Sequence, residues 1–387
     1  MSPEKFSSGN TVTLLHCGAE FFPALLRQIE EAKNEIFLET YVFATDEAAI
    51  YVLNALKSAA QRGVVVNLIT DWIGTGPKQN AMLSESLKLT KVNHRIFNRW
   101  FLRGVARTHR KVCVIDGKIA FVGGININHD LSSEHGPESL QSNRWDFSVM
   151  VRGPVVNLIH REAEIQWRRI SPLPLGKRTL PSTKLISGRS VFAMGSSLVA
   201  FLICDNFHNR LTIQKEYLRA INAATSYVLL ANPYFAPGRT FRDALTAAAV
   251  RGVDVKLLLG TGQYQFQDWV ARSYYRKLLA SGVTLIEYKK TQLHAKVAVI
   301  DDLWVTVGSS NCDGLSLFVN HEANLVIRDH TLASALSYCI RQGILDGVAV
   351  DSREFMVLPW YKRMLYGMAF LLYRAAMRLI TLNQPWN

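Results

Sequence analysis

The chain has 387 residues and carries 44 Lys and Arg against 31 Asp and Glu, a formal net charge of +13. Hydrophobic residues make up 49% and the mean hydropathy is +0.07, which excludes a disordered chain and allows about two domains with proper cores. No apolar run reaches the roughly 18–20 residues of a membrane span, and we expect no signal peptide. The five scattered cysteines predict buried thiols in a reducing compartment. The excess positive charge favours an anionic partner, either nucleic acid or acidic lipid.

The predicted elements alternate between helices and apolar strands along the chain. Two sets follow the same order of helix, strand, helix and strand. They span 20–33, 36–43, 46–62 and 64–70, and then 211–223, 228–235, 239–251 and 253–259. Gly63 and Gly252 stand where a glycine commonly ends a helix. A further helix, several strands and a last helix follow each set. This alternation predicts an α/β fold with a sheet buried on both faces.

The second set is a copy of the first. Residues 36–43 (IFLETYVF) resemble 228–235 (VLLANPYF), and 59–71 (AAQRGVVVNLITD) resemble 248–260 (AAVRGVDVKLLLG). A third pair, HRKVCVIDGKIAFVGGIN from residue 109 and HAKVAVIDDLWVTVGSSN from residue 294, keeps the same order. The offset falls from 192 to 189 to 185, as expected if the second copy has shorter loops. Three matches in one order indicate a duplicated unit.

The boundary between the copies is marked by composition. Residues 171–184 hold three prolines and no acidic residue, which is typical of a linker. We therefore predict a first repeat at 1–170, a linker at 171–190, a second repeat at 191–350 and a C-terminal tail at 351–387.

One constellation of functional side chains occurs in both copies with identical spacing. Its members are His109, Lys111, Asp116 and Asn126, and then His294, Lys296, Asp301 and Asn311. Histidine and lysine two positions apart share one face of a strand, whereas an aspartate seven positions from the histidine points elsewhere. We interpret the two aspartates as site residues that anchor the motif, and not as proton carriers.

Two such copies, packed about a pseudo-twofold axis, would form one shared active site. One neutral imidazole would attack phosphorus to give a phosphohistidine, and the other, protonated, would donate to the leaving alcohol and then act as a base. The lysines, together with Asn126 and Asn311, would hold the phosphate oxygens. No metal and no other cofactor is expected, because the lysines supply the positive charge and the sequence has no ligand cluster with metal spacing.

A nucleophilic imidazole also needs an acceptor that orients its second ring nitrogen. Asp146 in RWDFSVMV and Glu322 in NHEANLVI open the strands after each motif, 37 and 28 residues past the histidine of the same half. We predict that these two carboxylates orient the histidines of their own halves.

The doubled pattern H-x-K-x4-D-x6-G-[GS]-x-N resembles the paired HKD motifs of the phospholipase D superfamily, over roughly residues 10–345. Within that superfamily, the segments ANPYFAP (231–237) and VTVGSSNCDGLSLFVNHEAN (305–324) are similar to the B-type cardiolipin synthases of bacteria. The resemblance implies two tandem phospholipase-D-like repeats, each a mixed β-sheet flanked by helices. It also implies His109 as nucleophile and His294 as acid, an order that the similar repeats do not themselves decide.

The implied reaction is phosphatidyl transfer through phosphohistidine to the hydroxyl of phosphatidylglycerol. The partners are then phospholipid substrates and an anionic membrane surface, with no nucleic acid, on the cytoplasmic face of the bacterial inner membrane. The sequence does not distinguish phosphatidylglycerol from phosphatidylethanolamine as the phosphatidyl donor. Two other hypotheses remain: a phospholipase D hydrolase or nuclease with the same two-histidine site, and a lipid-binding scaffold with a dead site. The intact motifs argue against the scaffold.

Two basic segments lie outside the repeat pattern. Residues 88–111 hold eight Lys and Arg and no acidic residue, with an arginine every fourth position from residue 95 to residue 107. This pattern predicts a strand followed by a short basic amphipathic segment, which would equally suit a nucleic-acid backbone. The tail after Glu354 contains no acidic residue and predicts an interfacial helix on an anionic membrane. The alternative is a helix that packs on its own domain.

Overall fold

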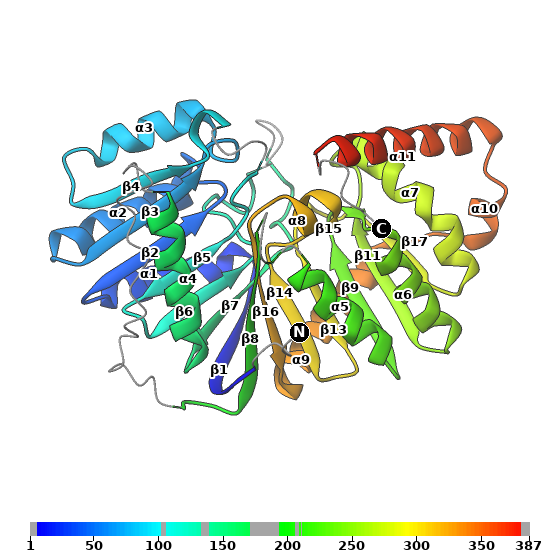
Figure 1. Ribbon diagram of the computed structural model, residues 1–387, viewed down its shortest axis with the longest axis horizontal. Helices are drawn as coiled ribbons and strands as arrows, with labels where there is room; N and C mark the ends of the chain where they lie inside the picture. The colour runs from blue at the N-terminus through cyan, green and yellow to red at the C-terminus, as the bar shows by residue number, and fades with distance from the viewer. Residues whose placement is uncertain are drawn as a thin grey trace.

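The computed structural model describes residues 6–101, 106–132, 139–170, 193–205, 209 and 211–380. The predicted linker at 171–190 lies outside these ranges. The two halves lie end to end along the longest axis of the molecule, with the N-terminal half running from blue through cyan to the green helix near its centre and the C-terminal half from green to red (Figure 1).

Each half alternates strands and helices in nearly the same order. The first half contains β1 (Ser7–His16), α1 (Cys17–Glu31), β2 (Glu35–Thr40), α2 (Glu47–Gln61), β3 (Val65–Asp71), α3 (Pro77–Leu87), β4 (Val92–Phe97), the 3₁₀ turn η1 (Arg99–Phe101), β5 (Val112–Ile115), β6 (Ile119–Gly123), β7 (Phe147–Arg152) and α4 (Val155–Arg169). The second half contains β8 (Ser197–Cys204), α5 (Thr212–Ala223), β9 (Tyr227–Asn232), β10 (Phe235–Ala236), α6 (Arg239–Val250), β11 (Asp254–Gly260), α7 (Gln265–Ala280), β12 (Thr284–Tyr288), β13 (Val297–Ile300), β14 (Trp304–Gly308), β15 (Cys312–Asp313), α8 (Gly314–Phe318), β16 (Glu322–Arg328) and α9 (His330–Asp346). The chain continues through β17 (Val348–Ala349), α10 (Ser352–Met356) and α11 (Trp360–Ile380).

Within the described residues, fifteen strands form one mixed sheet in the order β17-β12-β11-β9-β13-β14-β16-β8-β1-β7-β6-β5-β2-β3-β4. In each half three strands run parallel, and the strand that follows the HxK motif pairs antiparallel with the innermost of them, β5 with β2 and β13 with β9. The halves meet at β1 and β8, which pair antiparallel with an irregular register. Sequence analysis did not identify these two strands, although they join the repeats.

Local signals explain where the helices end. The residues just after α2 and α6 include Gly63 and Gly252, which adopt φ of +95° and +94°. This left-handed conformation is unfavourable for residues with a Cβ, and it turns the chain from the helix into the next strand. Asp46 caps α2 by accepting a hydrogen bond from the backbone N–H of Ala49.

The hydrophobic core has three parts. A central cluster draws on the strands of both halves and on α4 and α9, so the two repeats pack as one body. An outer cluster in the first half lies under α1 and α2, and another in the second half lies under α5, α6 and α7. The central cluster holds the two repeats in contact, and this is where the two HxK motifs meet.

The basic segment at 88–111 does not present its arginines on one helical face. Arg95 lies in β4 and stacks 3.8 Å from the ring of Trp167, and Arg99 begins the short turn η1. Residues 102–105 lie outside the described ranges. None of the helices in the described ranges has the length and apolar character that crossing a membrane requires.

Candidate active site

The two motif histidines enter the site on extended segments that pair across the halves. The backbone N–H of His109 donates to the carbonyl of His321 at 2.9 Å, and that of His294 donates to the carbonyl of Trp145 at 2.9 Å. The residue before each histidine forms a parallel bridge with the residue before the acidic residue of the other half. Each motif thus begins against the opposite repeat, as a pseudo-twofold arrangement requires.

This pairing corrects one detail of the sequence prediction. His109 and Lys111 precede β5, and His294 and Lys296 precede β13, so neither pair belongs to a ladder strand. The backbone N–H of each histidine donates to the other half, whereas the carbonyl of Lys111 accepts from Gly123 in its own half. In both halves the lysine folds back, and its Nζ donates to the carbonyl of its own histidine, at 2.8 Å for Lys111.

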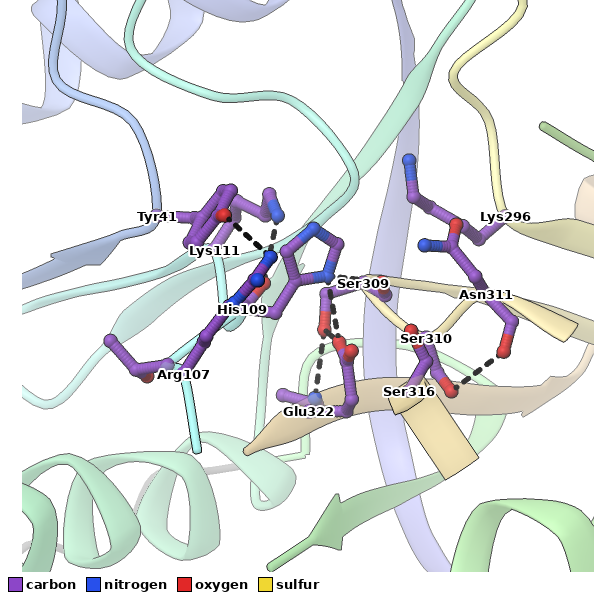
Figure 2. A network of polar contacts seen from close by, with 12 residues as sticks. Tyr41, Arg107, His109, Lys111, Lys296, Ser309, Ser310, Asn311, Ser316 and Glu322 are labelled. Carbon is purple, nitrogen blue, oxygen red and sulfur yellow. Dashed lines mark hydrogen bonds and ion pairs between the residues drawn. The ribbon is translucent and has the colours of Figure 1, made fainter. Parts of the chain in front are cut away.

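The imidazole of His109 is held through Nδ1. Its Nδ1 lies 2.9 Å from the carbonyl oxygen of Ser309 and 3.1 Å from Oε2 of Glu322 (Figure 2). Because a carbonyl oxygen only accepts, Nδ1 carries the proton, and in the neutral ring Nε2 then holds the lone pair. His109 thus has the tautomer that a nucleophilic Nε2 needs.

His294 is held in the same way by an acidic residue of the first half. Its Nδ1 lies 2.6 Å from Oδ2 of Asp146. Asp146 therefore faces His294, and Glu322 faces His109, whereas the sequence analysis paired each carboxylate with the histidine of its own half. The pairing is crossed because the segment before each motif pairs with the other half. Thr108 pairs with His321, directly before Glu322, and Leu293 pairs with Trp145, directly before Asp146.

Burial and charges from both halves set the electrostatics of the site. Burial lowers the pKa of His109; Glu322 opposes this effect, and the nearby charges of Lys111 and Lys296 add to it. Burial by itself would raise the pKa of Asp146, but His294 and Lys296 outweigh it and the pKa falls below its ordinary value. His109 is thus neutral near pH 7, and His294 has a charged carboxylate beside it. The charge of Lys296 lowers the pKa of both His109 and Asp146, which belong to the opposite half, so the two motifs form one electrostatic site.

The predicted phosphate-binding residues are also buried near the lysines. Lys111 is 6% exposed and Lys296 is 0% exposed, and Figure 2 draws both in the network around His109. Asn126 accepts a hydrogen bond from the backbone of Val42 at 3.3 Å. Oδ1 of Asn311 is buried, with no hydrogen-bond partner among the described residues.

Asp116 and Asp301 lie away from the histidines and hold backbone turns. The carboxylate of Asp116 accepts from the backbone N–H groups of residues 33, 34 and 35 at 2.7 to 3.0 Å. That of Asp301 accepts from residues 225, 226 and 227 at 2.7 to 3.0 Å. Burial would raise the pKa of each carboxyl, but these N–H groups outweigh it and lower the pKa. Both residues fix the turn that leads into the first parallel strand of their half.

Sequence analysis gave no role to two residues that shape the carboxylate positions. Ser309 donates its hydroxyl to Oε2 of Glu322 and accepts from the backbone N–H of Ala323 at 3.0 Å. The corresponding residue in the first half is Gly124, where a Cβ would lie 2.2 Å from Oδ1 of Asp146. The sequence signal for this role was that the first motif has Gly124 where the second has Ser309.

Tyr41 is a further residue that the sequence did not single out. Its ring lies 4.9 Å from that of His109 in an edge-to-face arrangement, and its hydroxyl accepts from Nη1 of Arg107 at 3.3 Å. The second copy has Pro233 at the matching position, so the repeat gave no sign of it. In the described ranges, no group of three or more His, Cys, Asp or Glu side chains is suited to a metal ion.

Comparison with known proteins gives matches over nearly the whole chain. The family model described as "Cardiolipin synthase, PLD-like domain" matches residues 25–136 and 217–342. Cardiolipin synthase B of Salmonella typhimurium is 36% identical over 362 residues, covering 91% of this chain and 85% of that protein. The cardiolipin synthase B of Escherichia coli K12 is also 36% identical, covering 89% and 82%. The crystal structure of phosphatidylserine synthase from Haemophilus influenzae shares the fold, with a TM-score of 0.69 at 14% identity over 98% of this chain and 97% of that one.

Proposed function

The chain belongs to the phospholipase-D-like family of cardiolipin synthases, and on this premise we propose that it transfers a phosphatidyl group to phosphatidylglycerol to form cardiolipin. The observation that carries the proposal is the crossed pair of histidines. Each imidazole is fixed through Nδ1 by an acidic residue of the other half, at 3.1 Å for His109 and 2.6 Å for His294. Such a pair supplies one nucleophile and one proton donor at a single phosphorus.

In the first step, Nε2 of His109 attacks the phosphorus of the donor phospholipid. A P–N bond forms, the P–O bond to the headgroup alcohol breaks, and protonated His294 gives its proton to the leaving oxygen. The lowered pKa of His109 supports the nucleophilic role, because its lone pair is available at neutral pH. The carboxylate of Asp146 supports the acid role, because it stabilises an imidazolium at His294.

In the second step, neutral His294 takes the proton from a glycerol hydroxyl of phosphatidylglycerol. That oxygen attacks phosphorus, the P–N bond breaks, and cardiolipin leaves with His109 regenerated. The product alcohol of the first step is glycerol if phosphatidylglycerol is the donor and ethanolamine if phosphatidylethanolamine is the donor.

Four side chains stabilise the negative charge that develops on the phosphate oxygens in both steps. Lys111 and Lys296 supply positive charge, and Asn126 and Asn311 supply amide N–H donors. Their burial supports this role, because a hydrogen bond to an oxyanion is stronger where water is excluded. Asp116 and Asp301 hold the turns behind the motifs and take no part in proton transfer.

We further propose that the protein works at the membrane surface, on the cytoplasmic face, and that the tail from residue 351 contacts the lipid. Phospholipid substrates are water-insoluble, so the site must meet them at a bilayer. The tail helix α11 supports this placement, because it exposes large apolar side chains next to basic ones.

Incubation of the purified protein with labelled phosphatidylglycerol tests the proposal. Cardiolipin with an equal amount of glycerol supports transfer, phosphatidic acid without cardiolipin shows a hydrolase, and cleavage of added DNA shows a nuclease. We expect His109→Ala and His294→Ala each to abolish cardiolipin formation. Full activity in either variant contradicts the two-histidine scheme.

A further inference from the structure

A cavity of about 380 Å³ lies between α7, α10 and α11. These helices form the outer end of the second half, away from the junction between the repeats (Figure 1). None of the motif residues lines the cavity. Its chemistry is therefore separate from that of the histidine site.

The lining of this cavity is basic and aromatic. Its basic members are Arg242, Arg272, Arg276, Lys277 and Arg363, and its aromatic members are Tyr274, Phe355, Tyr366 and Phe370. No acidic side chain is among the described residues that line it. A cavity with five cations and no anion attracts an anionic ligand.

Only part of this positive charge is balanced by nearby carboxylates. Arg272 forms two hydrogen bonds with Glu287, each of 3.0 Å, and Lys277 lies 2.5 Å from Asp243. Arg276 and Arg363, on α7 and α11, have no ion pair with any residue in the described part of the chain. These two guanidinium groups are therefore available to an external anion.

Gly367 gives the cavity its space. It lies inside α11 and lines the cavity, and a Cβ built there meets no atom within 4 Å. A glycine inside a helix costs about 1 kcal/mol relative to alanine. No neighbouring atom within 4 Å requires a glycine here, so a larger side chain at this position would extend into the open space beside the helix.

Helix α11 has one face that packs on the domain and an opposite face that is exposed, and the exposed face indicates the source of the anion. Ala369 and Met377 are buried against the domain, and the hydroxyl of Tyr373 accepts from the backbone N–H of Gly314 at 2.8 Å. At about 100° per residue, the other side of the helix carries a different set of large apolar side chains. These are Trp360, Met364, Met368, Leu371 and Leu372, and they are 47 to 68% exposed.

The tail helix thus fits both alternatives of the sequence analysis, packing on its own domain and contact with a membrane. One face packs on the domain, and the other is apolar and exposed. Arg363 lies on the edge between the two faces and belongs to the cavity lining. A helix of this kind lies in the interface of a membrane with its arginines at the level of the lipid phosphates.

We propose that this cavity binds the headgroup phosphate of an anionic phospholipid while the exposed face of α11 lies among the acyl chains. Arg276 and Arg363 hold the phosphate oxygens, since guanidinium groups match phosphate geometry. The aromatic side chains pack around the glycerol backbone. The occupant is a membrane lipid and not a soluble phosphate, because the cavity adjoins the exposed apolar face. The inference rests on the membrane contact proposed above and adds a second, non-catalytic lipid site.

Vesicle binding tests this site. The full-length protein is titrated with phosphatidylcholine vesicles and with vesicles of phosphatidylcholine and phosphatidylglycerol. The double variant Arg276→Ala with Arg363→Ala is expected to lose about 30-fold in affinity for the anionic vesicles, from roughly 1 kcal/mol per basic residue. Its affinity for the neutral vesicles is expected to stay unchanged.

The matched control removes two exposed arginines of α4, Arg161→Ala with Arg168→Ala. An equal loss in this control would mean general charge attraction and would overturn the proposal. Gly367→Phe keeps every charge but fills the cavity, and it is expected to abolish the preference for anionic vesicles. A Gly367→Phe variant that keeps the preference also overturns the proposal, as does competition by soluble glycerol 3-phosphate as strong as that by the lipid.

Failure here is distinguishable from failure of the proposed function. Cardiolipin formation from substrate dispersed in detergent micelles does not depend on vesicle binding, so the cavity variants are expected to keep it. His109→Ala is expected to lose product but bind anionic vesicles like the unmodified protein. If no cardiolipin forms at all and the cavity variants still lose vesicle affinity, the proposed function fails and the lipid site stands.

Discussion

The replacement Glu322→Gln tests the proposed roles of the two carboxylates, with Glu322 beside the nucleophile His109 and Asp146 beside the acid His294. The amide has nearly the same shape as the carboxylate but no charge. His109 becomes positively charged as its Nε2 bonds to phosphorus, and in the structure Oε2 of Glu322 lies 3.1 Å from its Nδ1. The variant therefore removes a negative charge at the point where positive charge develops.

The size of the effect follows from that distance. Two unit charges 3.1 Å apart interact by about 5 kcal/mol at an effective dielectric constant of about 20. The glutamine keeps a hydrogen-bond acceptor, and the carbonyl of Ser309 still accepts from Nδ1 at 2.9 Å, which together return about 1–2 kcal/mol. The remaining 3–4 kcal/mol corresponds to a loss of roughly 10²- to 10³-fold in kcat/KM.

The assay compares two donors in the first half-reaction. With phosphatidylglycerol as donor, Glu322→Gln and Asp146→Asn both slow the release of the alcohol. With phosphatidyl-p-nitrophenol, whose leaving group departs without a proton, the burst of p-nitrophenolate no longer needs the acid. Asp146→Asn is then expected to recover, whereas Glu322→Gln is expected to remain slow.

The opposite pattern would refute the proposed roles, in which Glu322 serves the nucleophile His109 and Asp146 serves the acid His294. If Asp146→Asn stays slow with the phenolic donor and Glu322→Gln recovers, Asp146 serves the nucleophile. Recovery of both variants would show that neither carboxylate assists the attack. The matched control is Glu85→Gln, at a carboxylate that is 75% exposed and lies in a surface ion pair. Such pairs contribute at most about 1 kcal/mol, so its rate is expected to be unchanged.

The other predictions concern the pH profile, the anchoring aspartates and one glycine. Because burial lowers the pKa of His109 below 6.5, kcat/KM is expected to hold at neutral pH and to fall only at lower pH, as the imidazole becomes protonated; a pH–rate profile with its acid limb above 6.5 contradicts this. Asp116→Ala and Asp301→Ala are each expected to lower the free energy of unfolding by about 1–3 kcal/mol in urea titrations, with little change in kcat of the folded protein. Since the pKa of both carboxyls is lowered in the fold, this stabilisation is present above pH about 4 and is lost as the pH falls through the folded-state pKa. Gly124→Ala is expected to reduce kcat about 10- to 100-fold, because its Cβ would lie 2.2 Å from Oδ1 of Asp146; an unchanged rate would mean that the carboxylate is free to shift.

The sequence predicted the elements that depend on local patterns. The helices over 46–62 and 239–251 end where the glycines were expected, with φ near +95°. The parallel strands were visible as short apolar runs. By contrast, β1 and β8 escaped notice, because only a part of each strand is buried and their pairing partners lie far along the chain.

The sequence by itself determined that the chain is a duplication and which side chains recur: histidine, lysine, aspartate and asparagine at fixed spacing. It did not determine how the copies face each other. Two repeats with the same motif offer each carboxylate two equivalent histidines, so spacing within a half is no guide. The tertiary structure decided the matter by pairing the residue before each histidine with the opposite half. That contact sets Glu322 beside a histidine 213 residues away and Asp146 beside one 148 residues away, because the carboxylate follows directly on the paired strand segment.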